Sequence, residues 1–178
     1  ASCDIYSFYL LEQLRALKIF VDLIITDAGK LVWEHELEKS WQLLKSYGDQ
    51  FYEERDISAP PASGSSDYGA MIIIPCSMGT LAGLATGQSK NLLLRAGDVM
   101  LKERKPLILV VRETPLNYVH LQNMLTVTAA GGVIFPAMPG FYTKPETLED
   151  LIKDFIGRIL QFLGLSSNQK SWKGLKSP

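Results

Sequence analysis

The sequence predicts a single α/β domain, with a doubly wound parallel sheet between two layers of helices. Three observations lead to this prediction. Apolar, β-branched runs alternate with stretches of helical periodicity along the chain. The runs at 70–74 and 107–111 are apolar throughout, which is typical of strands buried on both faces. Short polar segments follow the strands, at the sheet edge where folds of this kind bind ligands.

The first half of the chain contains two predicted helices, two strands and a loop. Apolar residues recur at helical spacing in 1–16 and in 31–47. Residues 20–26 are rich in β-branched side chains and lead into a polar turn, which favours a strand. Residues 57–68 hold too much Pro, Gly and Ser for a regular element. The run at 70–75 is the second strand.

The second half continues the alternation. A turn at 77–80 leads into a helical pattern from Leu81, and the later elements are a helix at about 90–102, strands at 107–111 and 133–135, and helices at 117–128 and 148–163. We expect residues 1–165 to form the domain and 166–178 to form a polar, mildly basic tail. Because the chain opens on a loop and a helix, either the sheet is one strand short or a strand precedes residue 1, and we expect the latter.

Composition narrows the class of protein. The chain has 178 residues, of which 47% are hydrophobic, and a domain of this size buries roughly 70% of its unfolded surface without a disulfide or metal. The two cysteines, Cys3 and Cys76, lack the spacing of zinc ligands, and Cys76 reads as a buried small apolar residue. The net charge of −1 argues against nucleic acid as a partner. No apolar stretch approaches the roughly 18 residues that span a bilayer, so we expect a cytoplasmic protein without membrane contact.

The most informative segment is 75–81, with the sequence PCSMGTL, directly behind a buried strand. A small, hydroxylated, Gly-containing turn at the start of a helix presents backbone N–H groups and hydroxyls, which favour an anionic or strongly polar ligand. A second block ends the strand at 107–111 on Arg112 and Glu113. Arginine can bind two phosphate oxygens at once, and a glutamate whose pKa is raised by burial can move a proton. The alternative is a structural ion pair at the strand end.

Several spaced motifs together resemble one known family. They are 75–81 (PCSMGTL), 101–106 (LKERKP), 111–115 (VRETP), 120–125 (HLQNML), 139–142 (PGFY) and the loop 61–65 (PASGS). In this order they resemble the flavin prenyltransferases, the UbiX-like proteins once described as aromatic-acid or phenylacrylic-acid decarboxylases. The resemblance covers nearly the whole chain.

The resemblance implies a flavodoxin-like or Rossmann-like flavoprotein subunit, assembled as a homododecamer with FMN at the subunit interfaces. It implies transfer of a dimethylallyl group from dimethylallyl phosphate to N5 and C6 of reduced FMN. The product, prenylated FMN, serves a separate decarboxylase. No metal is needed in that family.

The resemblance also assigns roles to individual residues. Those that match the flavin-binding positions are Ala1, Ser2, Thr26, Ser77, Met78, Gly79, Thr80 and Arg112. Those that match the positions holding the prenyl phosphate are Arg95, Lys102, Tyr142 and Arg158. Glu113 and Glu36 match carboxylates implicated in proton transfer around the flavin ring, and Ser2 belongs to the same catalytic set. Three cations and a phenol can hold a phosphate leaving group.

Ordinary structural roles stay open for some of these residues. Arg158 can belong to the solvated face of an amphipathic helix, Lys102 to an exposed charged run, and Tyr142 to an unremarkable loop. His120 lacks a partner at ligand spacing and reads as structural.

The first loop departs from the family pattern. Cys3 and Ser7 stand at glycine positions, and Asp4 stands at a position for a small apolar residue. Asp4 adds negative charge near a phosphate, and Ile57 stands where relatives often carry Trp. An FMN-binding partner or carrier protein without turnover is therefore the alternative function. Direct decarboxylation of an aromatic acid or a peptidyl cysteine ranks below both.

Overall fold

The computed structural model describes residues 1–165, and the predicted tail at 166–178 lies outside the described residues. The chain divides into two compact units, Ala1–Pro136 and Ala137–Pro178, which are described separately below. The fold is of the α/β, Rossmann-like class, as predicted, with parallel strands and helices alternating through the first unit. No helix among the described residues is long and apolar enough to cross a membrane.

The strands of the first unit all pair in parallel. Strand β1 (Asp22–Ile25) pairs with β2 (Gln50–Glu53), and β3 (Met71–Cys76), β4 (Leu107–Val111) and β5 (Val133–Ile134) form a three-stranded sheet in that order. Every residue of β4 is buried, which confirms the strand buried on both faces. Strand β2 was not predicted, because only its two central residues, Phe51 and Tyr52, are apolar.

The first unit, whose residues are all described, has five α-helices, and all but the first begin at a polar side-chain cap. They are α1 (Asp4–Ala16), α2 (Asp27–Leu37), α3 (Met78–Ala85), α4 (Leu92–Lys102) and α5 (Tyr118–Ala129). Thr26, Ser77, Asn91 and Asn117 each cap a helix by accepting the backbone N–H three residues on. His120 contacts the Asn117 cap from within α5, in line with the structural role predicted for it.

The prediction of one helix at 31–47 was wrong. Helix α2 begins earlier, at Asp27, and stops at Leu37, because Glu38 adopts a left-handed conformation with φ 51°. A separate 3-10 helix, η1 (Trp41–Ser46), follows. Trp41, the first residue of η1, stacks on Phe51 of β2. The apolar side chain of Trp41 is therefore packed against the protein, as the periodicity indicated, but from a 3-10 helix and not from α2.

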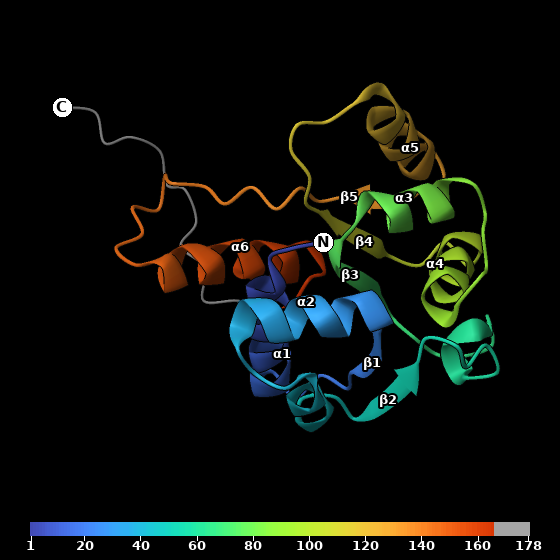
Figure 1. Ribbon diagram of the computed structural model, residues 1–178, viewed down its shortest axis with the longest axis horizontal. Coiled ribbons are helices and arrows are strands. Elements are labelled where there is room, and N and C mark those ends of the chain that lie inside the picture. The colour runs from blue at the N-terminus through green and yellow to red at the C-terminus, as the bar shows by residue number, and fades with distance from the viewer. Residues whose placement is uncertain (166–178) are drawn as a thin grey trace. The chain divides into compact units, whose positions relative to one another are not determined.

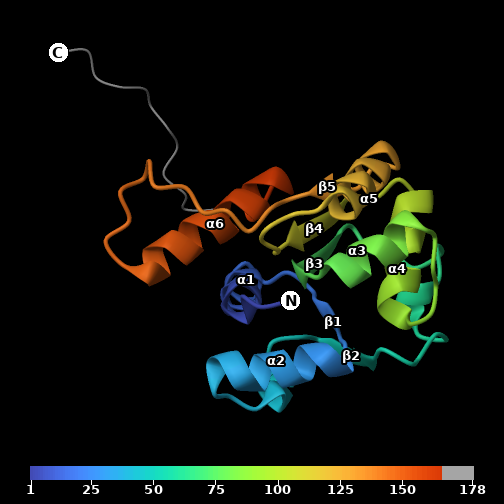
Figure 2. The ribbon, with the colours of Figure 1, turned by 45° about the horizontal axis from the view of Figure 1, so that its top comes forward.

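Two apolar clusters hold the first unit together. The larger includes Leu81, Leu107, Leu109 and Val127 and lies where α3 and α5 pack beside the sheet (Figure 1). The smaller joins Leu11, Trp33 and Leu44 of α1, α2 and η1. Figure 2 shows α3 next to α4, and they approach closely because glycines face leucines across the contact. The 3-10 helix η2 (Pro60–Ala62) packs on α4.

The second unit, within the described residues, consists of an irregular segment followed by helix α6 (Leu148–Phe162), close to the predicted 148–163. Thr147 and Asp150 form a capping box at its start, each side chain accepting the other residue's backbone N–H. Apolar residues recur at Ile152, Phe155, Ile156 and Ile159, as an amphipathic helix requires.

Candidate functional site

The turn after β3 presents backbone N–H groups at the carboxyl edge of the sheet. The Ser77 hydroxyl accepts the Thr80 N–H at 3.2 Å and lies 3.1 Å from the Thr80 hydroxyl, while the Ser77 carbonyl accepts the Leu81 N–H. The Leu81 bond is the first bond of α3 itself, and the Ser77 hydroxyl satisfies the Thr80 N–H, which has no partner within the helix. The N–H groups of Met78 and Gly79 also have no partner within the helix and can bind a ligand. This is the arrangement predicted from segment 75–81.

Gly79 keeps the space beside this turn open. A methyl group added at Gly79 would meet only the Ser77 hydroxyl oxygen, at 3.8 Å. A flat ligand can therefore approach the backbone there without displacing protein atoms. Cys76, just before the turn, is fully buried, and burial raises the pKa of its thiol to about 12. Cys76 is thus the buried apolar side chain that was predicted.

A second turn lies against the first. The Arg112 N–H donates to the Cys76 carbonyl at 3.3 Å, which places the segment after β4 beside the end of β3. Arg112 and Glu113 are both exposed, and the Glu113 carboxylate accepts the N–H of the next residue, Thr114, at 3.1 Å. Within residues 1–165 no ion pair joins Arg112 to an acid, so the structural ion pair considered above is not formed. The Arg112 guanidinium is available to an anion at this edge.

The loop before α1 is tied to α2 by Glu36. One carboxylate oxygen of Glu36 accepts the Cys3 N–H at 2.8 Å and the Asp4 N–H at 2.9 Å. Cys3 adopts a left-handed conformation, φ 88°, at the position where the family pattern has glycine. The structure thus brings Glu36 to the loop that carries Ser2, so two parts of the predicted site that are far apart in the sequence lie on bonded segments.

Asp4 is a site feature that sequence reasoning noted only as a departure. Its side chain is 7% exposed, and one carboxyl oxygen has no hydrogen-bond partner in the described structure. Burial, together with the nearby Glu36 carboxylate, raises the pKa of Asp4 to about 7. The charge at Asp4 was visible in the sequence, but its burial depends on how α1 packs on α2 and β3.

Thr26 stands at the carboxyl end of β1. Its hydroxyl oxygen accepts the Gly29 N–H at 3.0 Å and so caps α2. Because a hydroxyl both accepts and donates, its proton is still available to a ligand. Thr26 and the Ser77 turn thus occupy equivalent places, each after a parallel strand.

Arg95 and Lys102 lie elsewhere in the first unit. Arg95 donates to the Ala62 carbonyl at 3.1 Å and pairs with Asp98 at 2.9 Å, so it holds the 60–62 segment. Lys102 ends α4, just before β4 begins, and contacts Glu103. Arg112 follows the other end of β4, about 16 Å away along a five-residue strand. One chain therefore does not bring Lys102 to the Ser77–Arg112 edge.

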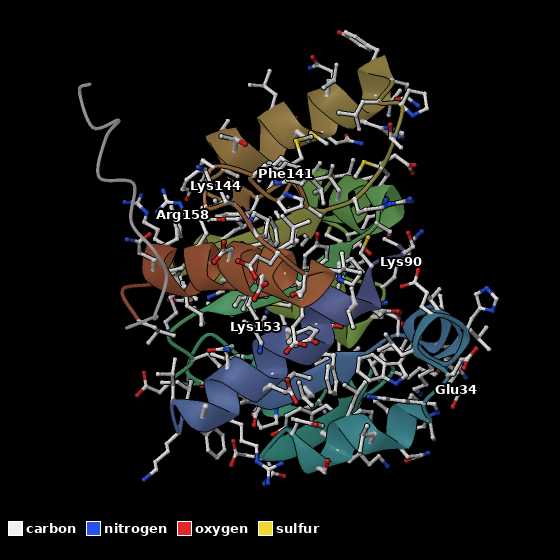
Figure 3. The ribbon with its side chains drawn as sticks, turned by 90° about the vertical axis from the view of Figure 1, so that its left-hand side faces the viewer. Glu34, Lys90, Phe141, Lys144, Lys153 and Arg158 are labelled. Atoms are coloured by element: carbon white, nitrogen blue, oxygen red, sulfur yellow. The ribbon has the colours of Figure 1, made fainter. Side chains whose placement is uncertain are left out.

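Tyr142 and Arg158 belong to the second unit. Both are exposed, and the Arg158 guanidinium donates to the Gln161 side chain at 2.5 Å. In the view of Figure 3, Arg158, Lys144 and Phe141 lie on one side of α6 and Lys153 lies on the other. The exposure of Arg158 fits a phosphate ligand and a solvated helix face equally well.

A cavity of about 320 Å³ lies at the opposite end of the first unit. Its lining includes Arg15, Lys18, Phe20 and Tyr47, where α1 ends and the chain approaches β1. None of the predicted site residues lines it. The chemistry is therefore expected at the carboxyl edge of the strands and not in this cavity.

Comparison with known proteins agrees with the motifs. The Flavoprotein family model matches residues 1–159. The flavin prenyltransferase UbiX of Pseudomonas aeruginosa is 54% identical over 174 residues, 90% of this chain and 83% of that protein. The flavin prenyltransferase UbiX of Methanocaldococcus jannaschii is 40% identical over 173 residues, 97% of this chain and 94% of that protein.

Solved structures extend the likeness to the fold. AnUbiX in complex with FMN and dimethylallyl pyrophosphate has a TM-score of 0.96 and 38% identity, covering 99% of this chain and 94% of its own. A dodecameric FMN-dependent UbiX-like decarboxylase from Escherichia coli O157:H7 has a TM-score of 0.94 and 36% identity, covering 98% and 95%. With its motifs, its fold and these relatives in agreement, the chain belongs to the UbiX-like flavin prenyltransferase family of flavoproteins.

Proposed function

We propose that this protein transfers a dimethylallyl group from dimethylallyl phosphate to N5 and C6 of reduced FMN. The observation that carries the proposal is the pairing of two turns at one sheet edge, where the Arg112 N–H bonds to the Cys76 carbonyl beside the open Gly79. Relatives named flavin prenyltransferase support it, as does the solved relative that holds FMN with dimethylallyl pyrophosphate.

The residues at this edge fit FMN. The open space at Gly79 admits a flat ring system, and the first turn of α3 offers N–H donors to polar ring atoms. Ser77, Met78, Gly79, Thr80 and Arg112 would hold the flavin with Thr26, Ala1 and Ser2. Bound there, reduced flavin supplies the nucleophilic nitrogen and carbon that accept the five-carbon group.

The leaving phosphate needs cations that stabilise its charge as the carbon–oxygen bond breaks. Arg95, Lys102 and Arg158 would supply positive charge, and the Tyr142 hydroxyl would donate a hydrogen bond. Since Lys102 lies at the other end of β4 from Arg112, we place a complete site between two copies of the chain. A dodecameric relative supports such an assembly, and we expect a homododecamer here.

Proton movements fall to the two glutamates. Glu36 is held by the N–H groups of Cys3 and Asp4, so its carboxylate has a defined position at the loop that contains Ser2. Glu113 adjoins Arg112 on the second turn and is open to solvent, which allows it to exchange a proton with water. Prenylated FMN made in the cytoplasm would then pass to a decarboxylase that depends on it.

One observation favours a second candidate. Cys3 carries a side chain in a left-handed conformation at the flavin-contacting loop, and a Cβ there limits how closely a ligand can approach. A protein that binds and delivers FMN without turnover would tolerate that restriction. Cys3→Gly combined with Ser7→Gly would not create activity in such a carrier.

The test is anaerobic incubation of the protein with reduced FMN and dimethylallyl phosphate, followed by mass analysis of the flavin. Prenyl transfer adds one five-carbon unit to the flavin mass. Bound but unmodified FMN would favour the carrier, and absence of both binding and modification would refute both functions. Lys102→Ala is the matched variant, since it removes charge from the phosphate site but leaves the flavin turns intact.

A further inference from the structure

Glu36 is anchored by the first turn of α1 and not by another side chain. A single oxygen of its carboxylate accepts the N–H groups of residues 3 and 4, at 2.8 and 2.9 Å. Two N–H donors at the start of a helix hold the carboxylate oxygen in place. The place of Glu36 in the site therefore depends on the charge and conformation of that first turn.

Asp4 adds a second carboxyl group to the same turn. It is nine-tenths buried, and one of its oxygens has no hydrogen-bond partner within the described chain. A buried carboxyl oxygen without a partner is tolerable when the group is neutral and costly when it is charged. Asp4 is also the residue whose N–H donates to Glu36, so the two groups are joined through the backbone.

Among the described residues, the groups facing Asp4 do not supply a compensating side-chain cation. Glu36 on α2 is negative and raises the pKa of Asp4, while the amino group of Ala1 opposes it weakly. Cys3 and Tyr6 lie on the same turn, and Cys76 ends β3, which packs on α1. Lys39, after α2, lies over the Phe8 ring, one turn further along α1.

We propose that Asp4 is a positioning residue for Glu36. With its proton in place, the neutral Asp4 carboxyl lets the N–H groups of residues 3 and 4 stay on Glu36. When that proton is lost to solvent, the Asp4 carboxylate on α1 and the Glu36 carboxylate from α2 meet at one turn, repel each other and displace Glu36. The consequence for catalysis rests on the proposed function, in which Glu36 moves protons. The family pattern has a small apolar residue here, so this control belongs to the present chain.

The first experiment is the pH profile of prenyl transfer for the wild type, Asp4→Asn and Asp4→Ala, between about pH 5.5 and 9. Wild-type transfer should fall by about threefold or more as the pH rises through the neutral range, because a single ionisation displaces Glu36. Both variants should lose that decline. Glu12→Gln, an exposed acid on the same helix, should keep the wild-type profile. Identical profiles for wild type and both Asp4 variants would overturn the proposal.

The second experiment needs no turnover. The raised pKa means that folded Asp4 retains its proton where the unfolded chain has lost it, so its stabilising effect is present below about pH 4 and is lost by about pH 7. The melting temperature of Asp4→Asn should therefore increase relative to that of the wild type as the pH rises across that window. In a Glu36→Gln background the gain should begin at the same pH but be smaller and complete at a lower pH, which simple packing at residue 4 would not produce.

The two experiments separate the possible failures. If no variant prenylates FMN but the melting curves behave as stated, the proposed function fails and the coupling of Asp4 to Glu36 stands. If the difference in melting temperature between Asp4→Asn and wild type is the same at every pH, or is unmoved by Glu36→Gln, the coupling is refuted whatever the activity.

Discussion

Cys3 adopts a backbone conformation that favours glycine, with φ 88° and ψ 35°. A side chain in this region costs about 1–2 kcal/mol, because its Cβ crowds the following carbonyl oxygen. The conformation persists because the Cys3 N–H is held by Glu36 and the helix starts at the next residue. Because Glu36, a predicted catalytic residue, holds this strained residue, a change that relieves the strain can also move the Glu36 carboxylate.

Replacing Cys3 by glycine should therefore stabilise the fold. We expect Cys3→Gly to raise the free energy of unfolding by about 1 kcal/mol, since relief of strain exceeds the extra entropy of the unfolded chain. Ser7→Gly is the matched control: Ser7 lies inside α1, where glycine costs about 1 kcal/mol. Urea unfolding of the two variants measures both, and a destabilised Cys3→Gly would show that the loop is not strained.

A substitution at Gly79 should change FMN affinity without lowering the stability of the fold. Because an added methyl group meets only the Ser77 hydroxyl oxygen at 3.8 Å, Gly79→Ala should keep or slightly raise the melting temperature. The same methyl group fills the space where we place the flavin, so FMN affinity should fall about tenfold or more. Quenching of flavin fluorescence on titration measures the affinity.

Gly83→Ala, in the same helix, is the opposite control. Its added methyl group would lie 2.8 Å from a Leu94 side-chain carbon, so it should lower the melting temperature and leave FMN affinity nearly unchanged. Equal FMN affinity in Gly79→Ala and the wild type would place the flavin elsewhere.

At the scale of the element, the strands were easier to predict than the ends of the helices. Strand β4 was predicted at its observed residues because it is buried on every side and carries no competing signal. Helix α2 was misjudged at both ends. Capped by Thr26, it begins four residues before the apolar periodicity does, and it ends because Glu38 adopts a left-handed conformation that the pattern at 31–47 does not reveal. Strand β2 exists because β1 pairs with it.

The same reasoning applies to the candidate site. The turns at Ser77 and Arg112 could be predicted, since the carboxyl ends of parallel strands meet at one edge. The bonds from the Cys3 and Asp4 N–H groups to Glu36 could not, because 32 to 33 residues separate the partners and α1 must first pack on α2. The burial of Asp4 follows from that packing as well.

Thr26 gives a prediction for the α2 cap. Thr26→Ala removes the acceptor of the Gly29 N–H and should lower the free energy of unfolding by about 1 kcal/mol. Thr26→Ser keeps a hydroxyl and should remain near the wild type in both stability and FMN affinity. Chemical denaturation and flavin titration of the pair would check it. If alanine and serine behave alike, the hydroxyl neither caps the helix nor contacts the flavin.

At the scale of the whole molecule, helix α5 exposes apolar side chains that nothing in the described chain covers. Tyr118, Leu121 and Leu125 recur at helical spacing on α5 and are all exposed, as is the adjacent Val119. An apolar stripe of this kind is typical of a surface that contacts another protein. Because a solved relative is dodecameric, we expect the partner to be a second copy of the chain, as proposed above. Leu121→Glu with Leu125→Glu should therefore reduce the molecular mass in solution while each chain stays folded, as light scattering and circular dichroism would show.

Assembly and catalysis can be tested together by mixing two inactive variants. If a site takes Arg112 from one chain and Lys102 from its neighbour, Arg112→Ala and Lys102→Ala each disable every site when assembled alone. Co-assembled from a denatured equal mixture, about one quarter of the sites receive both native residues, so about one quarter of the wild-type rate should return. Mixing without unfolding, which prevents exchange of subunits, is the control and should restore nothing. If both residues act within one chain, no mixture regains activity, because every chain lacks one of them.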